Sequence, residues 1–286
     1  GNLIGTNDLG DRAIPNLTGV SILNAPNNSV GLGLGGGNLI SGNLESGVLI
    51  DGPNATGNRV QGHKIGTDST GVLPLGNTAA GFSGAGVLIS DAKNNLIGGN
   101  EFSGAGNLIS GNEGIGVLIR GVTSTGPGDP GNTIQGNRIG TTINGDVRLP
   151  NKSLGVAISG ARNLIGGLMD GEGNLISGND GTGLLIETAD AVANTVVGNL
   201  IGTNAAATAA LPNLFSGISI DGAPDTLIGG SVPEALNLIS GNDGAGIVVA
   251  NSGATNTVII GNFIGTDLTG ALAIPNNGDG VLINQS

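Results

Sequence analysis

The sequence predicts an all-β chain folded as a single-stranded parallel β-helix, with three short strands in each coil and about nine coils. Three observations lead to this prediction: a repeated hexapeptide, short apolar/polar alternations bounded by Gly and Asn, and no helical periodicity. The hexapeptide NLISGN occurs four times at intervals of 63–69 residues, beginning at Asn38, Asn107, Asn174 and Asn237. A catalytic motif needs one copy, so four identical copies indicate repeated architecture.

The composition favours a core built from small repeated units. The 286 residues include 58 Gly, only four Phe, and no Cys, Trp or Tyr. A net charge of −12 disfavours nucleic acid and anionic membranes as partners. No apolar run approaches the roughly 18 residues of a membrane span, so membrane insertion is not expected.

Three short patterns alternate along the chain, and each predicts one strand of a coil. In the first, Gly-Val-x-Ile, the Val and Ile lie two residues apart and therefore face the same side. In the second, Asn-x-Ile/Val followed by Gly, the variable x is expected outside and the Ile or Val inside. The third pattern is either NLISGN or GNxIGT. The first pattern begins at Gly19, Gly47, Gly86, Gly116, Gly155, Gly183, Gly217, Gly246 and Gly280.

Short and long coils are predicted to alternate, which gives a structural period of two coils. Short coils contain NLISGN, whereas long coils contain GNxIGT and an insertion, for example after Thr67 and Thr141. Nine coils stacked at ~4.8 Å would form a rod of about 40 Å. We predict one domain over residues 1–286 with no evident cap at either end.

These motifs resemble the right-handed, pectin-lyase-like β-helix superfamily. They are more closely similar to Asn/Gly-rich repeats of the form GNxIGTDxxGxxxxPN…NxISGN in large surface proteins of bacteria and archaea. The resemblance covers essentially the whole chain. It implies a right-handed winding, consistent with the usual hand of parallel crossovers, and a location outside the cell or on its surface.

The two asparagines of each hexapeptide are expected to form ladders, in which each amide bonds to the amide one coil above. Asn also tolerates the left-handed backbone angles of tight corners. The predicted ladder residues are Asn38, Asn43, Asn107, Asn112, Asn174, Asn179, Asn237 and Asn242.

An outward apolar column is predicted on the third strand, because the second hexapeptide residue is always Leu. Its members are Leu39, Leu108, Leu175 and Leu238. Exposed apolar columns are usually covered, so we expect each long-coil insertion to fold over it. The covering residue is expected to be the one before proline. These residues are Ile14, Leu73, Leu149, Leu211 and Ile274.

No catalytic, cofactor or metal residue is assigned. The single histidine, His63, occupies a position that is Asn in the other GNxIGT copies, which indicates a substituted ladder position. GLGLGGG at Gly31–Gly37 precedes a strand, so it does not fit a dinucleotide site, which requires a following helix. Calcium at Asp170–Gly173 or Glu234–Asn237 has weak support, because such a site needs six or more oxygens. Acids are scattered, and aromatic platforms for sugars are absent.

The expected function is structural: a subunit of an end-to-end stacked filament, or a segment of a surface stalk. Both ends of the chain fall inside coil motifs, which is the basis for expecting head-to-tail self-association. Two alternatives stay open. One is a β-helix that binds or cleaves a polysaccharide, and the other is an adhesin that binds through the long-coil loops.

Overall fold

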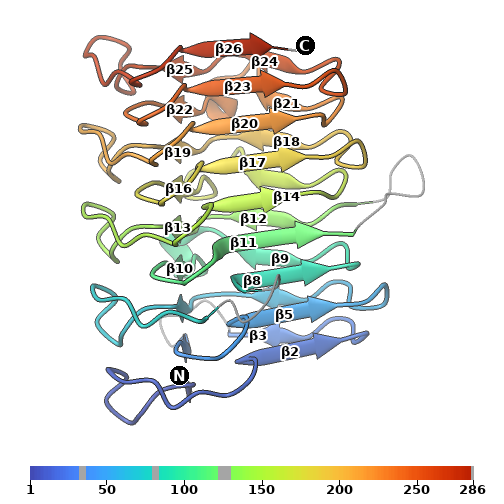
Figure 1. The fold of residues 1–286 in the computed structure, drawn as a ribbon, viewed down its shortest axis with the longest axis vertical. Coiled ribbons are helices and arrows are strands. Elements are labelled where there is room, and N and C mark those ends of the chain that lie inside the picture. The colour runs from blue at the N-terminus through green and yellow to red at the C-terminus, as the bar shows by residue number, and fades with distance from the viewer. Residues whose placement is uncertain (32–36, 79–83, 122–129, 285–286) are drawn as a thin grey trace.

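The chain winds into a rod of stacked coils in a computed structural model that describes residues 1–31, 37–78, 84–121 and 130–284. Each complete coil contributes one strand to each of three parallel sheets. The coils ascend in a right-handed sense from the N-terminus at one end of the rod to the C-terminus at the other (Figure 1). The architecture is a right-handed parallel β-helix, as the sequence predicts.

The Gly-Val-x-Ile stretches form the first sheet, in which nine strands pair in parallel. Val and Ile of each stretch face the interior and are buried in most coils. The strands are β2 (Val20–Leu23), β5 (Val48–Asp51), β8 (Ala85–Ser90), β11 (Ile115–Arg120), β14 (Val156–Ile158), β17 (Leu184–Glu187), β20 (Ile218–Asp221), β23 (Ile247–Ala250) and β26 (Val281–Asn284).

The Asn-x-Ile stretches form the second sheet, which has eight parallel strands. Tight corners follow these strands, and glycines such as Gly98 and Gly166 take positive φ there. The strands are β3 (Ser29–Val30), β6 (Arg59–Val60), β9 (Leu96–Gly98), β12 (Thr133–Gln135), β15 (Leu164–Gly166), β18 (Thr195–Val197), β21 (Leu227–Gly229) and β24 (Val258–Ile260).

The third sheet comes from NLISGN and GNxIGT, and its nine strands have two residues each. They are β1 (Leu3–Ile4), β4 (Leu39–Ile40), β7 (Lys64–Ile65), β10 (Leu108–Ile109), β13 (Arg138–Ile139), β16 (Leu175–Ile176), β19 (Leu200–Ile201), β22 (Leu238–Ile239) and β25 (Phe263–Ile264). Two 3-10 helices, η1 (Glu101–Ser103) and η2 (Pro233–Ala235), lie in the corners that lead from the second sheet to the third.

The register stacks like residues on like. Ile109, for example, pairs with Ile65 below and Ile139 above, and all three are fully buried. Each buried Ile stabilises the fold by roughly 1.5–3 kcal/mol. The stacked isoleucines give a continuous apolar interior without aromatic bulk.

Two unbroken ladders flank the third sheet, and together they contain all eight predicted asparagines. In each step the amide nitrogen of one residue donates to Oδ1 of the next coil, as in Asn174 to Asn199 at 2.9 Å. The ladder before the sheet consists of Asn2, Asn38, His63, Asn107, Asn137, Asn174, Asn199, Asn237 and Asn262, with His63 joined through backbone N–H groups. The ladder after it consists of Asn16, Asn43, Asn77, Asn112, Asn151, Asn179, Asn213, Asn242 and Asn276.

A third ladder precedes the second sheet and stops before the end of the rod. It runs through Asn28, Asn58, Asn95, Asn132, Asn163 and Asn194. The next position in the register is Thr226, whose buried hydroxyl has no hydrogen-bond partner among the described residues. This ladder therefore ends on an unsatisfied polar atom, a costly arrangement in a protein interior.

Candidate functional site

The outer face of the third sheet forms a groove along the rod, which we call the third-sheet groove. Three hollows of about 330, 350 and 440 Å³ share this face as their floor. Leu39 and Lys64 lie in the first, Leu108 in the second, Leu175 and Leu200 in the third. Insertions of the long coils form one wall, and the corners between the second and third sheets form the other.

The insertion wall is built from small hairpins that contact one another across the intervening short coil. Each hairpin is closed by an antiparallel bridge, such as Thr67 with Pro74. The backbone N–H of Ser69 donates to Gly10 O at 2.8 Å, and that of Ile143 donates to Gly71 O at 3.0 Å. These loops project beyond the third sheet on the left of Figure 1. The wall therefore repeats every second coil, about 9.6 Å along the axis.

The insertions cover the outward leucines, but two of the five expected covering residues, Ile14 and Leu73, are exposed. Leu73 is 61% exposed and Ile14 is 54% exposed, while Leu108 is only 3% exposed. The cover comes from the hairpin glycine, because a Cβ at Gly71 would lie 3.0 Å from Cδ2 of Leu108. Gly10 and Gly145 take the same place against Leu39 and Leu175.

The residues before proline have another role. Leu149, Leu211 and Ile274 are buried, and the carbonyl oxygen of each accepts a hydrogen bond from a hexapeptide glycine; Gly111 N to Leu149 O is 3.1 Å. In the second insertion this position belongs to Leu75, which accepts from Gly42, and not to Leu73. Backbone bonding to a hexapeptide glycine is thus the common feature at this position.

The corner-loop wall also joins loops two coils apart. The backbone N–H of Glu101 donates to Gly171 O at 2.8 Å, and the Asn100 amide donates to Asp170 O. Asn100 also caps η1 by accepting from the Phe102 N–H. These contacts place Glu101, Phe102 and Asp170 along one rim of the groove.

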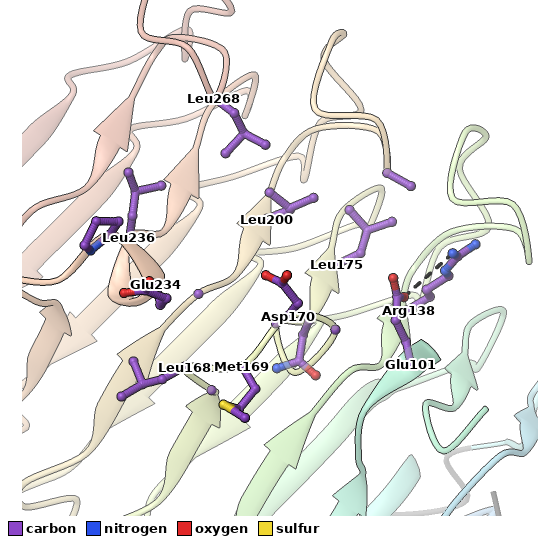
Figure 2. Close-up of a pocket in the computed structure, with 17 residues that line it drawn as sticks. Glu101, Arg138, Leu168, Met169, Asp170, Leu175, Leu200, Glu234, Leu236 and Leu268 are labelled. Atoms are coloured by element: carbon purple, nitrogen blue, oxygen red, sulfur yellow. Dashed lines mark ion pairs between the residues drawn. The ribbon is translucent and has the colours of Figure 1, made fainter. Parts of the chain in front are cut away.

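Arg138 crosses the groove between its two walls. Its guanidinium forms an ion pair with Glu101 at 3.7 Å and also donates to the Ile143 carbonyl of the insertion. Lys64 similarly donates to Ser69 O at 2.6 Å. Figure 2 shows the Arg138–Glu101 pair at one end of the 440 Å³ hollow of the groove and Glu234 toward the other, with Asp170 between them. Both basic groups are therefore bonded within the protein.

Two acidic groups of the same hollow differ in their bonding from the basic groups. Asp170 and Glu234 are exposed, and within the described part of the chain neither carboxylate has a hydrogen-bond or ion-pair partner. The remaining lining is mainly apolar and includes Leu168, Met169, Leu175, Leu200, Leu236 and Leu268. The hollow thus combines apolar surface with unpaired negative charge.

His63 lies in the ladder and is buried, and no hydrogen bond or ion pair among the described residues joins it to an acid. Its Nδ1 accepts from the Asn38 N–H at 2.9 Å, and its Nε2 lies 2.7 Å from the Val30 carbonyl oxygen. These partners fit the neutral imidazole that carries its proton on Nε2. Burial lowers the pKa of His63 below its ordinary value, against the opposing effect of the Val30 hydrogen bond. The ring acts as a structural group at a ladder position.

Asp68 and Asp267 close the turns of their insertions. Oδ1 of Asp68 accepts from the backbone N–H groups of Gly71, Val72 and Leu73 at 3.0–3.2 Å. Desolvation raises its pKa, but hydrogen bonds from Thr70 and the three amides outweigh this and hold it below the usual range. Asp267 has an equivalent set of bonds and the same direction of shift. These acids are not available as a catalytic pair.

The two calcium candidates belong to no larger cluster of acidic side chains among the described residues. Within the described ranges, no group of three or more His, Asp or Glu side chains could hold a metal ion. Glu172 accepts from the Met169 N–H at 3.1 Å, which makes it part of its own turn. Of the glycine-rich stretch Gly31–Gly37, positions 32–36 lie outside the described residues.

Phe102 was not predicted from the sequence as part of a binding surface. The ring is 75% exposed and lines the middle hollow, so an aromatic surface is present at the groove after all. Phe102 follows the Asn-x-Ile-Gly-Gly corner in a nonrepeated stretch, and no periodic pattern marks it. An aromatic residue in an otherwise aromatic-poor loop was the available signal.

Comparisons with known proteins assign the chain to no family. No family model matches the chain, and no curated protein sequence matches it. Among solved structures, the chain is similar to a mutant of the periplasmic alginate epimerase AlgG. The identity is 15% and the TM-score 0.44, over 81% of this chain and 55% of that one. No helix in the described part of the chain is long and apolar enough to span a membrane.

The strand order and the ladders define the class: this chain is a parallel β-helix protein with asparagine ladders. Among the described residues, no cluster of side chains defines a catalytic site.

Proposed function

We propose that the chain is a structural rod outside the cell, either a subunit of an end-to-end stacked filament or a segment of a surface stalk. The observation that supports this most is that the buried asparagines form hydrogen-bonded ladders between coils. Two nine-residue ladders run the length of the third sheet and tie every coil to the next. The single histidine belongs to one of these ladders, where it is buried and bonded on both ring nitrogens.

The ladders have a direction, and this restricts how rods can join. In every step between asparagines the N–H groups of the earlier coil meet Oδ1 of the later coil, as in Asn237 to Asn262. A coil placed against Asn262 can continue the ladder only if it offers Oδ1 groups, as the Asn2 face does. Head-to-tail stacking, a heterologous contact that does not close, satisfies this requirement.

In a head-to-tail stack, the next coil would pack on β26, the outermost described strand. Val281, Leu282 and Ile283 of β26 are exposed, whereas the equivalent residues of β23 are largely buried because β26 covers them. An apolar strand that is paired on one side only is a site for a further strand. We expect another coil to cover β26 in the assembled rod.

Sedimentation velocity tests this self-association. The sedimentation coefficient of the wild-type chain should rise with protein concentration, and Ile283→Lys should hold it at the value of a single rod. Leu73→Lys is the matched control, because Leu73 is equally exposed but lies on the insertion. A coefficient independent of concentration, or equal effects of the two variants, would contradict stacking through β26.

A second candidate is polysaccharide binding along the third-sheet groove. One observation favours it: three adjoining hollows follow the rod axis, and the exposed Phe102 ring lies beside them. Aromatic and apolar surfaces in a groove suit the C–H faces of sugars. Titration with neutral oligosaccharides, comparing wild type with Phe102→Ala, tests this, and a Phe102→Ala variant that binds unchanged would count against it.

A further inference from the structure

We infer that the third-sheet groove selects linear polysaccharides that carry positively charged amino groups over neutral or acidic ones. This inference rests on the polysaccharide candidate and adds the chemical class of the ligand. It starts from an imbalance in the largest hollow, where the basic group is bonded within the protein and two of the acids are not.

The imbalance of charge follows from how the charged side chains of this hollow are bonded. Arg138 is paired with Glu101 and donates to the Ile143 carbonyl, so little of its positive charge is available to a ligand. The carboxylates of Asp170 and Glu234 lack a partner among the described residues. With a net charge of −12 over the chain, the surrounding field also attracts cations and repels polyanions.

The shape of the groove favours a repeating polymer. The corner loops that carry Glu101, Asp170 and Glu234 belong to coils two apart, and so do the insertions of the opposite wall. The walls therefore repeat about every 9.6 Å along the axis. A ligand with a regular repeat can present similar groups to each pair of walls.

The backbone chemistry of the groove favours a sugar chain over a peptide. Peptides usually add to a sheet through free N–H and C=O groups at its edge. The groove floor is a sheet face, and its backbone groups already pair between coils, as in Leu175 N to Asn137 O at 2.9 Å. A bound peptide would leave its own backbone groups without partners, whereas sugar rings can pack on the exposed apolar side chains of Leu168, Met169 and Leu268.

The test compares two hexasaccharides with the same backbone: the glucosamine hexamer, which is cationic, and its fully N-acetylated form, which is neutral. Isothermal titration at low salt should give about tenfold tighter binding of the glucosamine hexamer, and added salt should reduce that advantage. Asp170→Asn and Glu234→Gln should each weaken its binding by about threefold. Asp190→Asn is the matched control, since Asp190 is exposed at a corner between the first and second sheets, away from the groove.

The outcomes separate the two proposals. Equal binding of both hexamers, unchanged in the variants, would overturn the charge selectivity and leave polysaccharide binding intact. If neither hexamer binds, both the charge selectivity and the polysaccharide binding are contradicted. Tighter binding of an alginate hexamer, or displacement of the glucosamine hexamer by oligolysine at equal charge, would also overturn the assignment.

Discussion

The backbone N–H of Asn38 donates to Nδ1 of His63 at 2.9 Å, so the single histidine of the chain continues an asparagine ladder as a neutral ring. Protonation would place a hydrogen on Nδ1 opposite that N–H and break the step between two coils. The ring packs so closely that a Cβ on Gly31 would lie 2.6 Å from its Cε1. No carboxylate of the described residues is bonded to the ring to stabilise its charged form.

His63→Asn should remove a pH dependence of stability. Burial holds the folded pKa of His63 below the unfolded value of 6.5, so the unfolded chain binds more protons as the pH falls through 6.5. The free energy of unfolding of the wild type therefore falls as the pH is lowered from about 7.5 through 6.5. We expect the melting temperature of wild type to drop by a few degrees more than that of His63→Asn over this interval. Parallel pH profiles of the two proteins would contradict this role.

Gly145→Ala should destabilise the insertion wall more than a glycine substitution elsewhere with the same backbone angle. A Cβ at Gly145 (φ +73°) would lie 2.8 Å from Cδ2 of Leu175 and 2.7 Å from Cβ of Ala205. Gly222 (φ +67°) has nothing within 4 Å and supplies the control. Both variants lose about 1 kcal/mol from backbone strain, and Gly145→Ala should lose a further 1–3 kcal/mol or so from overpacking. Chemical denaturation measures the difference, and equal losses would mean that the contact is not tight.

Leu108→Ala should cost about 2–3 kcal/mol of unfolding free energy, because Leu108 is enclosed by the hairpins around Gly71 and Ile143. Leu73→Ala should cost less than about 0.5 kcal/mol, since Leu73 is exposed. Urea titration of the two variants decides which residue is the buried one. A larger loss for Leu73→Ala would restore the expectation from the sequence.

Thr226→Asn should extend the third ladder by one step. Its Oδ1 would accept from the backbone N–H of Asn194, since the Asn194 side-chain amide already donates to Gly160 O and Ala191 O. The same substitution removes the unsatisfied Thr226 hydroxyl. A gain of about 1 kcal/mol is expected, by analogy with other buried hydrogen bonds. Thr226→Val separates the effect of removing the unsatisfied hydroxyl from the effect of adding a ladder bond, because it does only the first. If Val stabilises as much as Asn, the ladder step itself contributes nothing.

The coil architecture could be predicted from the sequence because the determining signals are local and repeated. Ile40 and Ile109 alternate with outward leucines inside identical hexapeptides, and the strands follow from that pattern. The ladder positions Asn16, Asn77 and Asn151 were missed, although an Asn at the end of each insertion recurs as regularly as the hexapeptide. They complete the same column because the insertion returns to the coil at that residue.

The groove could not be predicted in the same way, since its walls depend on contacts between coils about 70 residues apart. Glu101 N–H bonds to Gly171 O, and Arg138 reaches both walls. Glu101 and Gly171 lie outside the repeated motifs, and Arg138 occupies the variable position of GNxIGT, so no repeat reveals the pairing. The covering role of Gly71 was missed for a related reason. A glycine offers no side chain, so its contact with Leu108 appears only in three dimensions.

The central claim is that these coils belong to a longer extracellular rod. Negative-stain electron microscopy of the natural full-length protein tests this most directly. We expect straight particles much longer than the ~40 Å of nine coils, either as single stalks or as polymers that lengthen with concentration. Isolated particles of about 40 Å at every concentration, unchanged by Ile283→Lys, would contradict the claim.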